Sequence, residues 1–84
     1  MYKVYEVDVC FTSYAMDICL IGAKNVKDLK AHLREIFEGE LENINIEVLL
    51  ASSGKKELYS RIREMKSLFT DKPYTIIDRF GYYE

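Results

Sequence analysis

Three acidic residues near the N-terminus could form a cluster for proton transfer or metal binding. Glu6, Asp8 and Asp17 fall in two runs of alternating apolar and polar residues, and the alternation assigns all three to one face of a hairpin. Crowded carboxylates raise the pKa of at least one member, which suits proton transfer or a divalent cation. An open sheet face offers no enclosed pocket, however, and no histidine is spaced to complete a metal site. The sequence therefore predicts a solvated acidic surface and no bound metal.

A short polar loop made of Ser53, Gly54, Lys55 and Lys56 comes directly before a predicted helix. Free backbone N–H groups, the helix dipole and two lysines at such a place can hold a phosphate or another anion. The segment is not a Walker A loop, because position 49 is Leu instead of Gly and the first lysine is followed by a second. Serine and glycine also suit any junction into a helix, so both interpretations stay open.

The same predicted helix carries a basic flank. Lys56, Tyr59, Arg63 and Lys66 have the spacing that places three cations and an aromatic ring along one side of a helix. Such a flank suits a phosphate backbone or an acidic partner. The net charge of −2 argues against bulk binding of polyanions. Nucleic-acid or phosphate binding through this flank is therefore the alternative function, and membrane binding is not expected.

The C-terminus is unusually aromatic, with Phe80, Tyr82 and Tyr83 close to the end of the chain. Terminal residues are commonly frayed unless something holds them. These rings either fold back over an open end of the core or supply tyrosine-rich surface for a partner. The sequence does not decide between these two uses.

No set of residues has the pattern of an active site. His32 flanks the apolar stripe of a predicted helix without a nucleophile or a carboxylate that the fold would bring to it. Cys10 and Cys19 lack the spacing of zinc ligands, and no glycine-rich cofactor loop is present. The sequence therefore predicts a protein that is not an enzyme and needs no cofactor.

The elements that position these residues begin with a hairpin over residues 2–22. A two-residue turn would pair Phe11 with Tyr14, whereas a four-residue turn would pair Phe11 with Met16. Both registers keep Asp17 away from the apolar face, since a slip by one residue would turn its carboxylate into the core. The sequence does not decide between the two turns, but both predict that Asp17 lies on the same face as Glu6 and Asp8.

Asn25 is a good N-cap, Asp28 suits the first helical turn, and Gly39 is a natural stop. Further alternation and helical spacing continue to Pro73, which must end any helix before it. The predicted elements after the hairpin are a helix at 26–38, a strand at 44–51, a helix at 55–69, a strand at 74–80 and an aromatic tail at 81–84.

The order β-β-α-β-α-β predicts an α+β fold. Crossovers through helices would make the second, third and fourth strands parallel, and the hairpin would make the first antiparallel. Because one hairpin face is polar, both helices are expected on the other face. We therefore predict one domain over residues 1–84, a two-layer sandwich with a mixed four-stranded sheet and two helices on one face.

Length and composition set the class of protein. The chain has 84 residues, 12 basic and 14 acidic side chains and 49% hydrophobic residues. That length fits one modest core, and an oligomer interface would add stability. The longest apolar runs, 18–21 and 48–51, are far too short to span a bilayer. With two apparently buried thiols and no targeting segment, we expect a cytoplasmic protein with free cysteines.

Two segments carry a resemblance to a class of proteins. They are Ile21-Gly22-Ala23-Lys24-Asn25-Val26-Lys27-Asp28-Leu29, which leads a hairpin into a capped helix, and Gly81-Tyr82-Tyr83-Glu84 at the end. Together they resemble small uncharacterised proteins encoded by bacterial phages and conjugative elements. The resemblance implies a bacterial accessory or antagonist protein that works by binding, and it identifies no site.

The leading function is a non-enzymatic module that binds another protein or itself. A sheet with helices on one side leaves its other face open, and the apolar content of this face is higher than solvent favours. The predicted partner-binding residues on that face are Val4, Glu6, Asp8, Asp17, Ile21 and Leu49.

Overall fold

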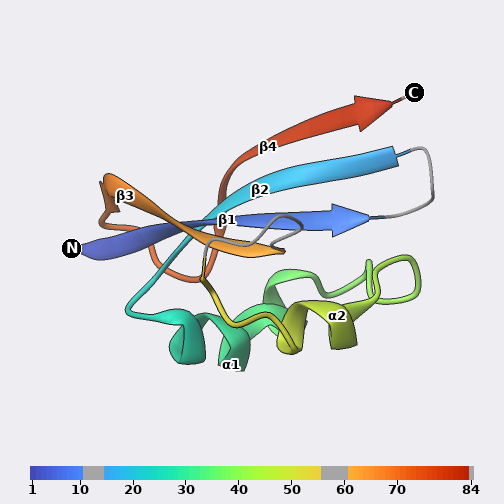
Figure 1. Cartoon of the computed structure of the whole chain (residues 1–84), viewed down its shortest axis with the longest axis horizontal. Helices are drawn as coiled ribbons and strands as arrows, with labels where there is room; N and C mark the ends of the chain where they lie inside the picture. Colours follow the sequence, from blue (N-terminus) through green and yellow to red (C-terminus); the bar gives the residue numbers. More distant parts are fainter. Residues whose placement is uncertain (11–14, 56–60, 84) are drawn as a thin grey trace.

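The computed structural model describes residues 1–10, 15–55 and 61–83, of which 15, 82 and 83 are described by their backbone alone. Four antiparallel strands form one sheet in the order β3-β1-β2-β4, and both helices lie on one side of it (Figure 1). The α+β class and the four-stranded sheet are as predicted. The predicted element order and the mixed sheet are wrong, because the described elements run β-β-α-α-β-β and the strands are antiparallel. Neither described helix is long and apolar enough to cross a membrane.

The hairpin is confirmed, with β1 at Tyr2–Cys10 and β2 at Ala15–Ala23. Its register matches neither predicted turn, because Val9 stands opposite Asp17 and Cys10 opposite Met16. This pairing has the parity that the sequence argued against, so every β2 side chain lies on the face opposite to the expected one. Asp17, Cys19, Ile21 and Ala23 thus face the helices, and the intervening residues face away.

The first helix is also confirmed. Helix α1 spans Val26–Ile36, a little less than predicted, and Phe37 is its C-cap. The Asn25 side chain accepts a hydrogen bond from the Asp28 N–H at 2.8 Å, and the Asp28 carboxylate accepts one from the Lys24 N–H at 3.0 Å. These contacts satisfy backbone donors that the start of a helix leaves free.

The predicted strand at 44–51 is wrong, because helix α2 occupies Ile46–Leu50. Asn45 caps it, and its side chain accepts from the Val48 N–H at 3.4 Å. Ile46 and Leu49 are buried and Val48 is exposed. This three-residue spacing fits one turn of helix over the core, whereas a strand would turn Ile46 and Val48 to the same face.

The predicted helix at 55–69 is wrong where the structure describes it. Residues 62–70 form strand β3 (Ile62–Thr70), which pairs with the free edge of β1, while residues 56–60 lie outside the described residues. Ile62 stands opposite Val7 and is fully buried, whereas Phe69 is 59% exposed. Backbone hydrogen bonds to β1 therefore favour a strand here, although the apolar spacing of the sequence is typical of a helix.

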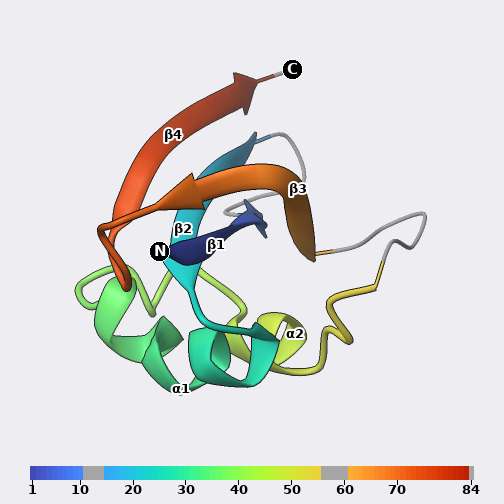
Figure 2. The same ribbon diagram turned by 90° about the vertical axis from the view of Figure 1, so that its left-hand side faces the viewer.

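Strand β4 spans Ile76–Tyr83 and pairs with β2, which confirms a last strand but moves its bounds. The predicted tail is therefore wrong at 81–83, because these residues continue β4 in register with the start of β2. In Figure 2 strand β4 rises away from the helices, whereas β3 arches across the sheet over β1, on the side opposite the helices.

The core lies between the sheet and the helices. Tyr5, Val7 and Val9 of β1 meet the inward residues of β2 and Ile62 of β3. The helix side of this core consists of Leu29, Leu33, Phe37, Ile44, Ile46 and Leu49. The apolar faces of both helices and of the sheet are thereby removed from water in one cluster.

Replacing Gly54 with alanine is expected to destabilise the fold by about 1 kcal/mol or more beyond the effect of Gly39→Ala. Both glycines have a positive φ, +76° and +88°, which costs an alanine about 1–2 kcal/mol. At Gly54 an added Cβ would also lie 2.3 Å from Cγ2 of Val26, whereas at Gly39 nothing lies within 4 Å. Urea unfolding of both variants measures the difference, and equal losses would contradict the close approach of this loop to α1.

Candidate functional site

We define the open face as the side of the sheet away from the helices. Its central row crosses three strands, because Asp8 of β1 stands opposite Ile18 of β2, and Ile18 stands opposite Phe80 of β4. The row beside it places Arg63 of β3 opposite Glu6, and Glu6 opposite Leu20. The open face thus includes Val4, Glu6, Asp8, Cys10, Met16, Ile18, Leu20, Arg63, Asp78 and Phe80, of which Val4 is buried at 4% exposure.

The charges of the open face gather on β1 and β3. The Arg63 guanidinium makes an ion pair with Glu6 at 2.8 Å. Asp8 Oδ1 and Arg63 Nε are both shielded from solvent and have no hydrogen-bond partner among residues 1–10, 15–55 and 61–83. Unpaired buried polar atoms cost stability, so this part of the face carries unused hydrogen-bonding capacity.

Asp8 is the titratable group most affected by this arrangement. Burial, and secondarily the charge of Glu6, raises the pKa of Asp8 to about 6, while Arg61 and Arg63 act in the opposite direction. The expected rise in the pKa of one acid is therefore present, but its main cause is desolvation rather than crowding. Asp17 takes no part in a cluster on this face, because it lies on the other side of the sheet.

The Asp8→Asn variant is expected to be more stable than wild type by about 1–2 kcal/mol at pH 7. A carboxyl whose pKa is raised on folding destabilises the folded state when ionised, and the penalty disappears as the pH falls from about 6 to below 4. The gain should therefore be large at pH 7 and absent near pH 4. Urea unfolding at both pH values measures it, with Asp71→Asn at an exposed position as the control. A variant less stable than wild type at pH 7 would contradict the burial of this carboxyl.

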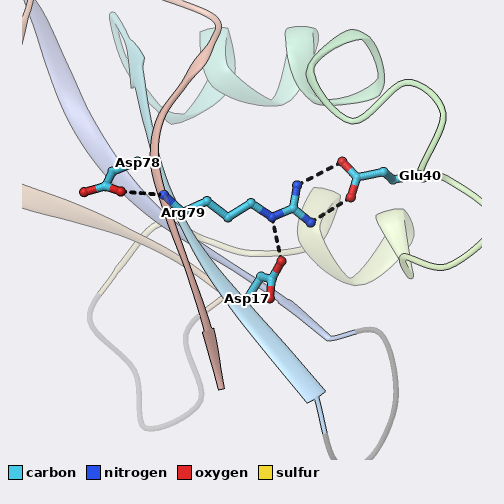
Figure 3. Close-up of polar contacts among 4 residues, drawn as sticks. All are labelled: Asp17, Glu40, Asp78 and Arg79. Carbon is cyan, nitrogen blue, oxygen red and sulfur yellow. Dashed lines mark hydrogen bonds and ion pairs between the residues drawn. The ribbon is translucent and has the colours of Figure 1, made fainter. Parts of the chain in front are cut away.

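A second charged group lies on the helix side of the sheet and connects two strands to the loop after α1 (Figure 3). Arg79 Nε donates to Asp17 Oδ2 at 2.5 Å, and its two terminal nitrogens donate to both carboxylate oxygens of Glu40 at 3.0 and 2.7 Å. The hydrogen bonds with Arg79 hold the pKa of Glu40 below its usual range, and those with Glu40 and Asp17 raise the pKa of Arg79. The group joins β2, β4 and the loop after α1, and every charge in it is paired.

A third cluster joins the β3–β4 connection to α1. The Tyr74 hydroxyl donates to the Asp28 carboxylate at 2.8 Å, and its ring stacks on His32 with centroids 3.8 Å apart. The hydrogen bond to Asp28 is the main reason that the pKa of Tyr74 rises to about 12. His32 Nδ1 donates to the Asp28 carbonyl oxygen at 2.9 Å. These contacts engage a polar atom of each of the three residues and hold the β3–β4 connection against α1.

The two cysteines lie on opposite faces of the sheet and are both free. Burial raises the pKa of Cys19 to about 11, which keeps this thiol neutral. Cys10 is exposed, accepts a hydrogen bond from Arg61, and lines a cavity of about 170 Å³ beside Asn45 and Leu49. Among residues 1–10, 15–55 and 61–83, no group of His, Cys, Asp and Glu is placed to hold a metal ion.

The structure keeps three of the predicted partner-binding residues on the side of the sheet away from the helices, namely Val4, Glu6 and Asp8, but Val4 is 4% exposed and so is not available to a partner. The other three lie on the helix side, where Asp17 is 8% exposed and Ile21 and Leu49 are part of the core. The parity of the hairpin and the helical state of 46–50 explain these errors. Met16, Ile18 and Leu20 lie on the open face instead. Their face could not be predicted, because it depends on the register of the hairpin.

The predicted tail contributes Phe80, which is 49% exposed on β4, while nothing is described of the Tyr82 and Tyr83 side chains. The prediction of a basic flank along a helix is wrong at Arg63 and Lys66, because both residues lie on strand β3. Arg63 is also paired with Glu6. Lys56 and Tyr59 lie outside the described residues. Ser53, Gly54 and Lys55 are not helical, and residues 56–60, which directly follow them, lie outside the described residues.

Arg79, which holds Asp17 and Glu40 together, was not indicated by the sequence. Its partners lie 62 and 39 positions away along the chain, and only the pairing of β4 with β2 brings them together. No protein-family model, curated protein or solved structure matches this chain. The geometry of the open face is therefore the basis for a functional proposal.

Proposed function

We propose that this chain is a non-enzymatic interaction module that binds a protein partner through the open face of its sheet. The observation that supports this proposal is the apolar row of Met16, Ile18 and Leu20 with Phe80, on the side of the sheet away from both helices. Phe80 is 49% exposed and the other three are partly exposed, and apolar side chains that stay accessible on a sheet face favour contact with another protein over contact with water.

The charges of the same face give the proposed interface its selectivity. The Glu6–Arg63 ion pair places a negative and a positive group beside the apolar row, so a partner of complementary charge is favoured over others. An apolar centre beside an ion pair is the common arrangement of protein interfaces. A cytoplasmic accessory or antagonist role, as the resemblance implies, would use such a surface.

Affinity capture from the native cell, followed by mass spectrometry, tests the proposal with two matched variants. Ile18→Thr removes apolar surface from the open face, and Val48→Thr makes the same kind of change on the exposed side of α2. We expect Ile18→Thr to reduce recovery of the partner about fivefold or more, and Val48→Thr to leave it unchanged. Equal recovery with both variants, or loss with Val48→Thr alone, would place binding elsewhere.

Nucleic-acid or phosphate binding has weaker support. The helix that would have aligned the cations is absent from residues 62–70, and Arg63 is already paired with a carboxylate. Retardation of DNA or RNA at low salt, lost in an Arg63→Gln/Lys66→Gln variant, would favour this alternative instead.

A further inference from the structure

A cavity of about 170 Å³ lies where β1 extends past the start of β3. The first residue of β3, Ile62, stands opposite Val7, and the Asp8 N–H donates to the Arg61 carbonyl oxygen at 2.8 Å. Among the described residues, the pairing between these two strands goes no further along β1. Arg61 therefore lines an opening between the end of β1 and helix α2.

Four of the residues that line this cavity are apolar. Val9, Ile44 and Leu49 are buried, whereas Val48 is exposed on α2. An apolar cavity of about 150 Å³ is large enough to bind benzene, so this one has room for a group of about six carbon atoms. Such a group would leave water when it lies against these side chains, which favours its binding.

Arg61 supplies an accessible positive charge in the same cavity. Its Nη1 donates to Cys10 Sγ, and its side chain makes no other hydrogen bond or ion pair within the part of the chain that the structure describes. The Nε and Nη2 donors are not among the shielded atoms of the described residues. These two nitrogens form one edge of the guanidinium, and such an edge can hold both oxygens of a carboxylate.

We propose that this cavity binds a small carboxylic acid, whose carboxylate pairs with the Nε–Nη2 edge of Arg61 and whose apolar body lies against Val48 and Leu49. The inference goes beyond the proposed function, because the cavity lies between β1 and α2 and not on the apolar row of the open face. Asp8 also lines the cavity, and its ionised carboxylate opposes an anion. A single negative charge on the ligand is therefore favoured over the higher charge of a phosphate group.

Benzoate is the probe for this site, and benzamide, which has the same ring and no charge, is its matched control. Titration of the full chain, followed by two-dimensional proton–nitrogen NMR, should give a Kd of about 1 mM for benzoate. The shifts should be confined to residues 8–10, 44–49 and 61. Benzamide should bind about tenfold more weakly, because it cannot form the charge-assisted pair with Arg61. This comparison needs no variant of the protein.

Three variants assign the charges. Arg61→Gln should weaken benzoate binding about tenfold and leave benzamide binding unchanged, whereas Arg34→Gln, which removes an exposed arginine paired with Glu47 of α2, should change neither. Asp8→Asn should strengthen benzoate binding about threefold, because it removes the opposing charge.

Four results would overturn the site. They are equal affinity for benzoate and benzamide, equal losses in the two arginine variants, weaker benzoate binding by Asp8→Asn, and no saturable shift up to about 10 mM benzoate. Capture of a partner that depends on Ile18, found together with any of these results, would leave the proposed function intact while rejecting this inference.

Discussion

Replacing Arg79 with methionine is expected to lower the free energy of unfolding by about 3–5 kcal/mol at neutral pH. The change removes the guanidinium that neutralises Asp17, whose side chain is 12% exposed on the helix face of the sheet. It also releases Glu40 and the loop that Glu40 holds against β4. Urea unfolding followed by circular dichroism measures the loss.

Two further variants separate the causes of that loss. Glu40→Gln removes only the more exposed arm of the group and should cost about 1 kcal/mol. Asp17→Leu combined with Arg79→Met replaces the buried carboxylate and its partly buried partner by apolar groups and should recover most of the stability. A single Arg79→Met variant within 1 kcal/mol of wild type would show that Asp17 does not depend on this arginine.

Replacing Phe37 with alanine is expected to cost about 3–5 kcal/mol. Phe37 is fully buried, belongs to the single core cluster of the described residues, and caps α1 through its N–H, which donates to the Leu33 carbonyl at 3.0 Å. The variant would leave a cavity where the end of α1 meets the sheet. Thermal and urea unfolding both measure the loss.

The exposed aromatic ring of Phe69 provides the matched control for this prediction. Phe69→Ala removes the same atoms from a side chain that is 59% exposed, so it should cost about 1 kcal/mol or less. Phe37→Leu keeps most of the buried volume and should fall between the two. Similar losses for Phe37→Ala and Phe69→Ala would contradict the location of the core.

Local signals in the sequence were sufficient for the hairpin and for α1. Strict alternation identified both strands of the hairpin, and Asn25 with Asp28 marked the start of the helix. These features depend on neighbours within a few residues. They could therefore be predicted without knowledge of the tertiary structure.

The face of the hairpin could not be predicted, because it depends on a partner from the far end of the chain. The sequence rule that a carboxylate belongs in water placed Asp17 outside, and Arg79 reverses that rule by neutralising it within the fold. Once the parity is reversed, Ile21 enters the core and Ile18 joins the open face. Three of the six partner-binding residues predicted on the sheet face were misplaced, and two of them, Asp17 and Ile21, for this reason.

The second half of the chain was ambiguous for a different reason. Residues 62–69 have an apolar spacing typical of a helix, but β1 offers an unpaired edge that the same residues can satisfy as a strand. Asn45, with Ile46 and Leu49 three apart, was a signal for a short helix that the alternation of 44–50 obscured. In residues 62–69 pairing with β1 prevailed over a helical spacing. In residues 46–50 a capped helical turn that buries Ile46 and Leu49 prevailed over alternation.

A photo-crosslinking amino acid at defined positions in the native cell tests the central claim most directly. Placed at Ile18 it reports on the open face, and placed at Val48 it reports on the exposed side of α2. The proposed function predicts that a partner protein is cross-linked from position 18 and not from position 48. Cross-linking of the same partner from position 48 alone, or of none from position 18, would contradict binding through the open face.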